Sequence, residues 1–305
     1  MNDLDKHLLK IINEELSKKN TAYNIRKNGK SIERECTENI KIVSKTDKPG
    51  IDIYVDDNTT NGYVHIPVLL TTSGLNDKVY NDFHIGKNAN VVINAGCGIH
   101  NDAHTDSEHE GIHRFFLEKG ATVKYIEKHY GEGEGTGKRI LNPVTEVYLK
   151  EGASLEMDTA QIRGVSSTIR KTKGVLKDNS KLVITERIMT HDNQTAKTIF
   201  DVKLNGKNSS VKVTSRSVAT ENSKQSFVSK VVGNNDCFGH VECDAIIQDN
   251  ACVTSDPKII ANNIDARLIH EATIGKIAGE QLIKLMTLGL SEKKAEETII
   301  KGFLK

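Results

Sequence analysis

The spacing of hydrophobic and polar residues changes twice along this chain of 305 residues. Near the start, apolar residues recur three or four positions apart, which predicts an amphipathic helix over residues 3–19. From about residue 40, short alternating runs rich in Val, Ile and Thr take over, separated by Gly, Asn and Asp. Such runs predict strands, so we expect an N-terminal helical segment at 1–40 before a β portion. The apolar positions of the helix are Leu4, Leu8, Ile11, Ile12 and Leu16.

A turn motif recurs through the β portion, in which a Gly or Asn and a small residue precede an alternating strand. Gly and Asn readily adopt positive φ, as a stacked tight turn requires. Repeats at similar spacing predict a solenoid whose coils bury apolar side chains against one another. A β-sandwich is the alternative, because it also has short strands and frequent turns. The motifs centre on Asn88, Gly120, Gly152, Asn179, Asn208 and Asn250, at spacings of 32, 32, 27, 29 and 42 residues.

After residue 264 the pattern becomes helical. A broad apolar face includes Ile274, Leu282 and Leu285, Gly289 can end a first helix, and Ser291 can cap a second. We therefore expect a β core at 41–265 and a C-terminal helical hairpin at 266–305. In the simplest arrangement the hairpin covers the last coil, because an uncovered sheet edge promotes aggregation.

Charge and composition exclude several function classes. The 42 basic and 41 acidic residues leave no positive excess that would favour nucleic acid or an anionic membrane. The N-terminus carries acids early and no long apolar run, so we expect neither a secretory signal nor a membrane span, and a cytoplasmic location. The absence of Trp and an aromatic content of 5% argue against a stacking groove for sugars or bases.

Two local motifs bear on cofactors. The odd number of cysteines without an export signal predicts free thiols, which leaves metal ligation open. The run GEGEGTGKR only partly matches a phosphate-binding loop, because Glu132 and Arg139 stand where that motif needs Gly and Ser or Thr. We therefore expect this chain to bind no nucleotide. The cysteines are Cys36, Cys97, Cys237, Cys243 and Cys252.

A first candidate site joins Cys243 with His270 and Glu271, which follow it by 27 and 28 residues. This separation is about one coil, so the strands that carry them could stack side by side. A thiolate, an imidazole and a carboxylate would together hold iron or another transition metal. The alternative is that Cys243 is a small buried apolar residue.

A second candidate site is a dense run of potential ligands within 17 residues. Such a set suits zinc or iron, although its spacing is not that of a zinc finger. Because acidic residues are interleaved, an exposed polar connection is the alternative. The ligands are Cys97, His100, His104, His109 and His113.

The run HEATIGKIAGEQLIKLMTLGLSEKKAEETIIKGF, with GHVECDAII upstream, resembles the C-terminal part of the SufB/SufD family over residues 239–303. The resemblance implies a right-handed parallel β-helix, a dimer with itself or a SufB/SufD paralogue, and a SufC-like ABC ATPase bound through the C-terminal helices. It also implies a scaffold and not an enzyme. This scaffold receives sulfur from a donor together with iron, and passes a transient iron–sulfur cluster to apo-proteins.

Residue by residue, Cys243 matches the family's cluster-building cysteine, and His270 with Glu271 matches its His-Glu pair. Ile269 departs from the pattern, since SufB proteins have a further Glu there. Cys252 aligns with another cysteine common in SufB. The residues that the resemblance assigns to ATPase docking are Ile274, Ile277, Gln281, Leu282 and Leu285.

The chain is short for the family and resembles an archaeal or anaerobe-type branch in which one SufB-like protein works alone. Cys97 is a candidate entry point for sulfur in such a protein. The competing function is a zinc-dependent hydrolase on a β-solenoid, in which the His100–His113 cluster holds a metal that activates water.

Overall fold

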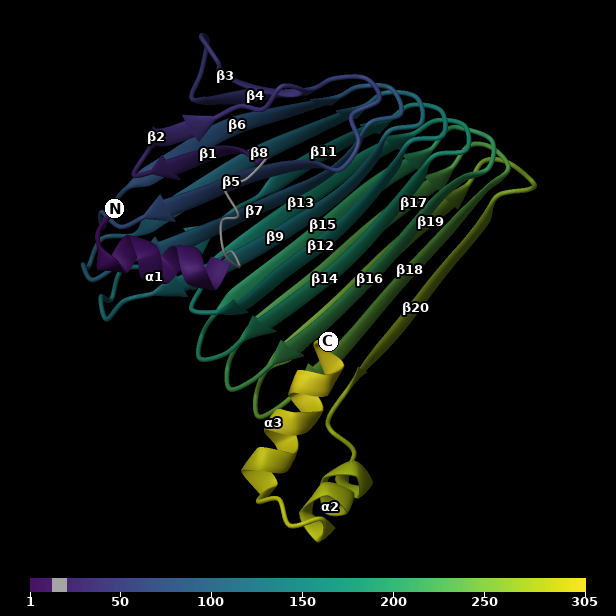
Figure 1. The fold of residues 1–305 in the computed structure, drawn as a ribbon. Helices are drawn as coiled ribbons and strands as arrows, with labels where there is room; N and C mark the ends of the chain where they lie inside the picture. Colours follow the sequence, from purple (N-terminus) through teal and green to yellow (C-terminus); the bar gives the residue numbers. More distant parts are fainter. Residues whose placement is uncertain (13–20) are drawn as a thin grey trace.

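The computed structural model describes residues 1–12 and 21–305, and 59% of the chain is strand. The strands wind into a β-solenoid of about eight turns, with one helix beside its N-terminal half and two helices beyond its C-terminal end (Figure 1). The predicted mainly β solenoid is therefore confirmed.

The solenoid wall consists of two ten-stranded sheets. The first contains, in spatial order, β2 (Lys30–Glu35), β1 (Ala22–Lys27), β5 (Gly62–Leu70), β7 (Asn90–His100), β9 (Thr122–Glu132), β12 (Ser154–Arg163), β14 (Lys181–Thr190), β16 (Ser209–Ala219), β18 (Cys237–Ile247) and β20 (Arg267–Gly275). The second contains β19 (Cys252–Ala261), β17 (Lys224–Gly233), β15 (Thr195–Leu204), β13 (Ser167–Leu176), β10 (Arg139–Leu141) with β11 (Val144–Leu149), β8 (Ser107–Leu117), β6 (Asn76–Ile85), β4 (Gly50–Val55) and β3 (Ile40–Ser44).

Parallel pairing between coils sets the register of the core. Ser154, for example, pairs with Thr122 one coil earlier and with Lys181 one coil later. Because side chains alternate across each strand, every second residue points into the solenoid and stacks on its counterpart in the next coil. One such row is fully buried and runs along the first sheet through Val91, Val123, Leu155, Leu182 and Val211.

The predicted turn positions lie at one corner of the solenoid, with one exception. Asn88, Gly120, Gly152, Asn179 and Asn208 all have positive φ, as the motif predicted. Asn250 was wrongly aligned with them. It lies at the opposite corner, between β18 and β19, where the preceding Asp249 adopts positive φ. The spacing of 42 residues thus covers a coil and a half.

The first helix, α1 (Asp3–Ile12), packs against the outer surface of the wall (Figure 1). Leu8 and Ile12 are fully buried there, and Leu16 lies outside the described residues. Any Cβ at Gly96 would come within 3.1 Å of Ile12, and one at Gly98 within 3.3 Å of Leu8. These two glycines therefore give the helix room to approach the sheet.

Two segments that were expected to be helical are strands. Residues 22–35 form β1 and β2, although the region 1–40 was expected to be a helical segment. Residues 267–275 form β20, which pairs in parallel with β18 along nearly its whole length. Pairing with the neighbouring coil decides these cases, because an edge of the sheet offers backbone partners that a helix cannot use.

The expected helices at the C-terminus are confirmed as α2 (Gly279–Thr287) and α3 (Glu292–Phe303). Gly289 follows α2 with a φ of 93°, and the Ser291 side chain accepts a hydrogen bond from the backbone N–H of Lys294 at the start of α3. Among residues 1–12 and 21–305, no helix combines the length and the apolar character needed to cross a bilayer.

Candidate functional site

The C-terminal end of the solenoid is open. In the described part of the chain, its last strands β19 and β20 each pair with one neighbour, β17 and β18 respectively. Ile259 and Ile269 on these strands are 43% and 44% exposed. We call the surface formed by β19 and β20 the open end; it presents unpaired backbone groups and apolar side chains together.

Cys243 lies on β18, one coil inside the open end, and points into the solenoid. It is 2% exposed and pairs in register with Ser215 on β16. Burial raises the pKa of its thiol to about 11, while a hydrogen bond with the Ser255 side chain acts in the opposite direction. In the single chain this cysteine is therefore a protonated thiol at neutral pH.

His270 shares the inner face with Cys243. It pairs with Val241, whereas Cys243 pairs with Ala272, so the two side chains are offset by two positions on adjacent strands. Both ring nitrogens of His270 are buried, and neither has a hydrogen-bond partner within residues 1–12 and 21–305. Burial, with a smaller contribution from His240, lowers its pKa. The ring is thus a neutral imidazole with unused ligand atoms.

Glu271 points the other way. It pairs with Glu242, and its Oε2 lies 3.1 Å from Nε2 of His240 on the outer face of the sheet. Ile269 lies on this outer face as well. A single chain therefore brings Cys243 and His270 together but does not bring Glu271 to them. His240, three residues before Cys243, is the outer-face partner that sequence reasoning missed.

The histidine-rich run divides between two environments. His100 and His104 lie by a corner, where His100 Nε2 is 2.7 Å from Asp102 and His104 Nδ1 is 2.7 Å from Thr136. His109 and His113 instead point into the solenoid from β8 and are buried. The expected cluster of four histidines with one cysteine does not form as a unit.

A polar network that sequence reasoning missed crosses the solenoid interior. Arg170 Nη2 lies 2.9 Å from Glu127 Oε2, and Arg170 Nε lies 3.1 Å from Glu186 Oε2. Burial opposes ionisation of Glu127, yet His129 and Arg170 together lower its pKa. Burial raises the pKa of Glu186. The signal was present in TVKYIEKHYGE, where polar residues occupy the same alternate positions as the inward-facing Val123.

Cys97 and Cys243 belong to separate regions. Five strand spacings of the first sheet separate β7 from β18. At 4.7–4.9 Å per spacing, the two strands are about 24 Å apart. The two cysteines of one chain therefore cannot bind the same ion.

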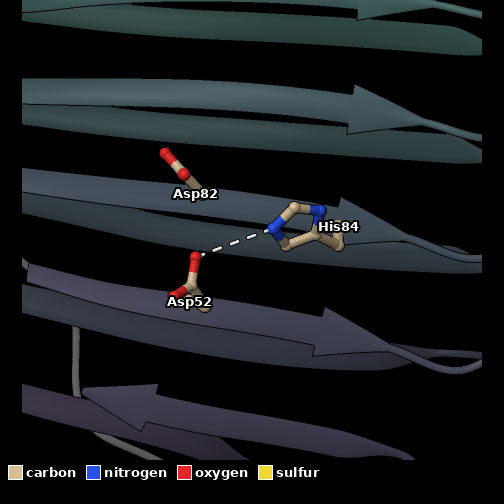
Figure 2. Close-up of side chains that lie close together, drawn as sticks. All are labelled: Asp52, Asp82 and His84. Carbon is tan, nitrogen blue, oxygen red and sulfur yellow. Dashed lines mark ion pairs between the residues drawn. The ribbon is translucent and has the colours of Figure 1, made fainter. Parts of the chain in front are cut away.

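Asp52, Asp82 and His84 gather on the outer face of the second sheet (Figure 2). Both carboxylates already have a cationic partner, since Lys45 Nζ lies 2.5 Å from Asp52 and 2.8 Å from Asp82. Arg114 also donates two hydrogen bonds to Asp82. Because these cations neutralise the acids, the cluster is better explained as a link between coils than as a metal site.

The residues expected to dock an ATPase lie in different places. Ile274 is on β20, while Ile277 and Gln281 line a groove of about 470 Å³ between the helices and the last strands. Leu282 and Leu285 are half-buried on α2. The most exposed apolar side chains of this region were not among those expected to dock an ATPase: Ile283 (61%), Met286 (41%) and Leu288 (80%).

Comparison with known proteins gives a consistent family. Residues 166–303 match the model described as SUF system FeS cluster assembly, SufBD core domain. An iron–sulfur cluster assembly SufBD family protein of Methanocaldococcus jannaschii is 32% identical over 188 residues, which cover 61% of this chain and 59% of the relative. Another, from Pyrococcus horikoshii, is 27% identical over 83% of this chain and 77% of its own length.

The iron–sulfur cluster assembly protein SufB of Bacillus subtilis is 28% identical over 66% of this chain, and the match spans 43% of that relative. The resemblance found in the sequence is thus confirmed. The core domain supports a role in iron–sulfur cluster assembly.

Proposed function

Starting from the SufBD core domain that this chain carries at residues 166–303, we propose that it is the scaffold component of a SUF-type complex. On this scaffold sulfur and iron combine into a transient cluster that is then passed to apo-proteins. The chain performs no catalysis of its own and binds no nucleotide in this proposal. We place it in the cytoplasm, where a reducing environment keeps thiols free.

One observation carries the proposal. Beside the Cys243 thiol at the open end, His270 has two buried ring nitrogens without a protein partner in the described residues. A buried polar group without a partner is costly, so its retention favours a ligand-binding role. Thiolate and imidazole are both established ligands of iron in clusters. Bound iron would also displace the thiol proton that burial now retains.

A second chain would complete the site. Pro257 interrupts the N–H row of β19, whereas β20 runs for nine residues without a proline. We therefore propose that two open ends meet mainly through β20, either from two copies or from this chain and a paralogue. Such a dimer would cover Ile259 and Ile269 and would double the set of ligands. Glu271 would act at the outer rim of this interface.

The ATPase partner is proposed to dock on α2. Its exposed apolar residues lie beyond the solenoid wall, next to the strand that carries His270 (Figure 1). A partner that moves α2 during ATP hydrolysis would pull on β20 through the short connection at residues 276–278. Hydrolysis itself belongs to this SufC-like ABC ATPase.

The test is anaerobic reconstitution with ferrous iron and sulfide, followed by visible absorption and Mössbauer spectra. We expect the wild type to form a cluster, and Cys243→Ser and His270→Ala to lose most of it. Cys237→Ser is the matched control, because Cys237 is equally buried on the same strand but lies at its other end. Full cluster formation by both site variants would refute the assignment.

A zinc hydrolase receives less support. Its ligands divide between a corner and the interior. The space beside the interior histidines is about 10 Å³, which admits one water or ion but no substrate.

A further inference from the structure

A small cavity lies inside the solenoid where β8 faces β7 and β9. Its volume of about 10 Å³ matches a single water molecule or metal ion. Unlike the surrounding apolar core, its wall carries several groups able to bind a metal. The side chains that provide them are Cys97, His109, His113, Glu127 and His129.

His109 is oriented by an ionised carboxylate. Its Nδ1 lies 3.1 Å from Asp77 Oδ2, and Asp77 is held by Arg26 through contacts of 2.5 and 3.0 Å. Burial opposes ionisation of Asp77, but His109 and Arg26 bring its pKa well below the usual range. A carboxylate accepts only, so Nδ1 carries the proton and Nε2 presents a lone pair. Carboxylate, histidine and metal form this same relay in many metal sites.

His113 has the same tautomer for a similar reason. Its Nδ1 lies 2.7 Å from the Tyr125 hydroxyl, which donates its own hydrogen to Glu127 Oε1 at 2.8 Å. The hydroxyl oxygen therefore accepts the proton of Nδ1, and Nε2 is again unprotonated. Burial lowers the pKa of His113 to about 4, so the ring is neutral at physiological pH. A neutral imidazole is the form that binds metals.

Gly111 leaves the space between these two rings empty. A Cβ at this position would lie 3.3 Å from Nε2 of His109 and 3.3 Å from Nε2 of His113. Both lone-pair nitrogens thus lie beside the volume that any other residue would fill. His129 does not compete for this role, because its Nδ1 accepts a hydrogen bond from Arg170 at 3.0 Å.

Cys97 supplies the third donor from the opposite sheet. Burial and the nearby Asp77 and Glu127 charges raise the pKa of its thiol, so it is protonated while the cavity is empty. We propose that His109, His113 and Cys97 form a binding site for one divalent transition-metal ion of the zinc or ferrous class. Two imidazoles and one thiolate are a donor set that both ions accept.

Binding would release one proton, from Cys97 to solvent, and form two metal–nitrogen bonds and one metal–sulfur bond. In the described residues these donors do not yet lie within 4.8 Å of one another, so the ion would draw both rings and the thiol inward. The site is about 24 Å from Cys243 along the solenoid and is independent of cluster assembly there.

Anaerobic titration of chelator-treated protein with Co²⁺ tests the site. The Cys243→Ser background removes any signal from the open end. We expect one Co²⁺ per chain with a thiolate-to-cobalt charge-transfer band, and displacement by Zn²⁺. Cys97→Ser should abolish that band. Gly111→Ala retains all three donors but fills the space of the ion, and should weaken binding about tenfold or more.

The matched control is His104→Gln, which changes a histidine of the same run that lies at the corner. It should bind Co²⁺ as its parent does. Thermal unfolding followed by circular dichroism checks that each variant folds, and His109→Gln replaces Gly111→Ala if the latter does not. The proposal is overturned if the parent binds no Co²⁺, if the charge-transfer band survives Cys97→Ser, or if the folded cavity variant binds as tightly as its parent.

Discussion

Arg170 illustrates how single residues stabilise this interior. It lies between Glu127 on β9 and Glu186 on β14, so its guanidinium connects three strands from both sheets. Thr198 and Ser215 donate further hydrogen bonds to Glu186. Such buried groups are tolerable only when each has partners, and here the neighbouring coils provide them. The network therefore ties the register of one coil to that of the next.

His65 gives a prediction of pH dependence. Burial lowers its pKa from 6.5 to about 4, so the unfolded chain binds a proton more readily than the folded one between these values. The stability that neutral His65 contributes is therefore complete above pH 6.5 and is lost as the pH falls toward 4, by roughly 3 kcal/mol at most.

Urea unfolding at pH 7 and pH 4.5 measures this effect. The wild type should lose stability at the lower pH, and His65→Leu should lose distinctly less. His113 and His129, whose pKa values are also lowered, would account for the remaining loss. An identical loss in the wild type and His65→Leu would contradict the prediction.

The faces of Cys243, His270 and Glu271 show what sequence can and cannot provide at this scale. Their separation correctly indicated neighbouring strands, because it equals one coil. Residues 270 and 271, however, must lie on opposite faces of any strand. The sequence suggested a helix there, so this consequence was not drawn. Only the pairing of β20 with β18 reveals it.

At the level of elements, local patterns predicted what local forces determine. The alternating runs and the positive-φ positions gave the coils, and Ser291 gave the start of α3. The strand β20 could not be predicted in this way, since its alternation is weak and the neighbouring coil supplies its backbone partners. The glycines at 96 and 98 are similar, because their role depends on the helix α1 that packs against them.

The helix α2 carries the prediction about the ATPase. Ile283→Glu with Leu288→Glu places two charges on its exposed apolar surface, where they would be desolvated in a complex. We expect pull-down of the partner ATPase to fall at least about tenfold, while the variant still forms dimers.

Ile169→Glu is the control for this experiment, because Ile169 is also an exposed apolar residue, 40% accessible, but lies on β13 in the solenoid wall. Retention of the ATPase by the α2 variant, or its loss in the β13 control, would show that docking occurs elsewhere.

The two ends of the whole molecule differ in a way that favours a closed dimer. At the N-terminal end, β2 and β3 fold back antiparallel on β1 and β4, and β2 has the charged sequence KSIERE. Charged and reversed edge strands prevent further strand addition. At the C-terminal end, β20 carries exposed Ile269 and Ile274 instead. One protected end and one open end predict pairs of chains and not filaments.

The most direct test asks whether the cluster requires two open ends. Ile269→Lys places a charge on the edge of β20 while leaving Cys243 and His270 in place, so it should yield a monomer. Iron and sulfide per chain would be measured after anaerobic reconstitution, together with mass by light scattering. The account predicts a dimeric, cluster-containing wild type and a monomeric variant with about tenfold less iron. A monomeric variant with the same cluster content as the wild type would contradict it.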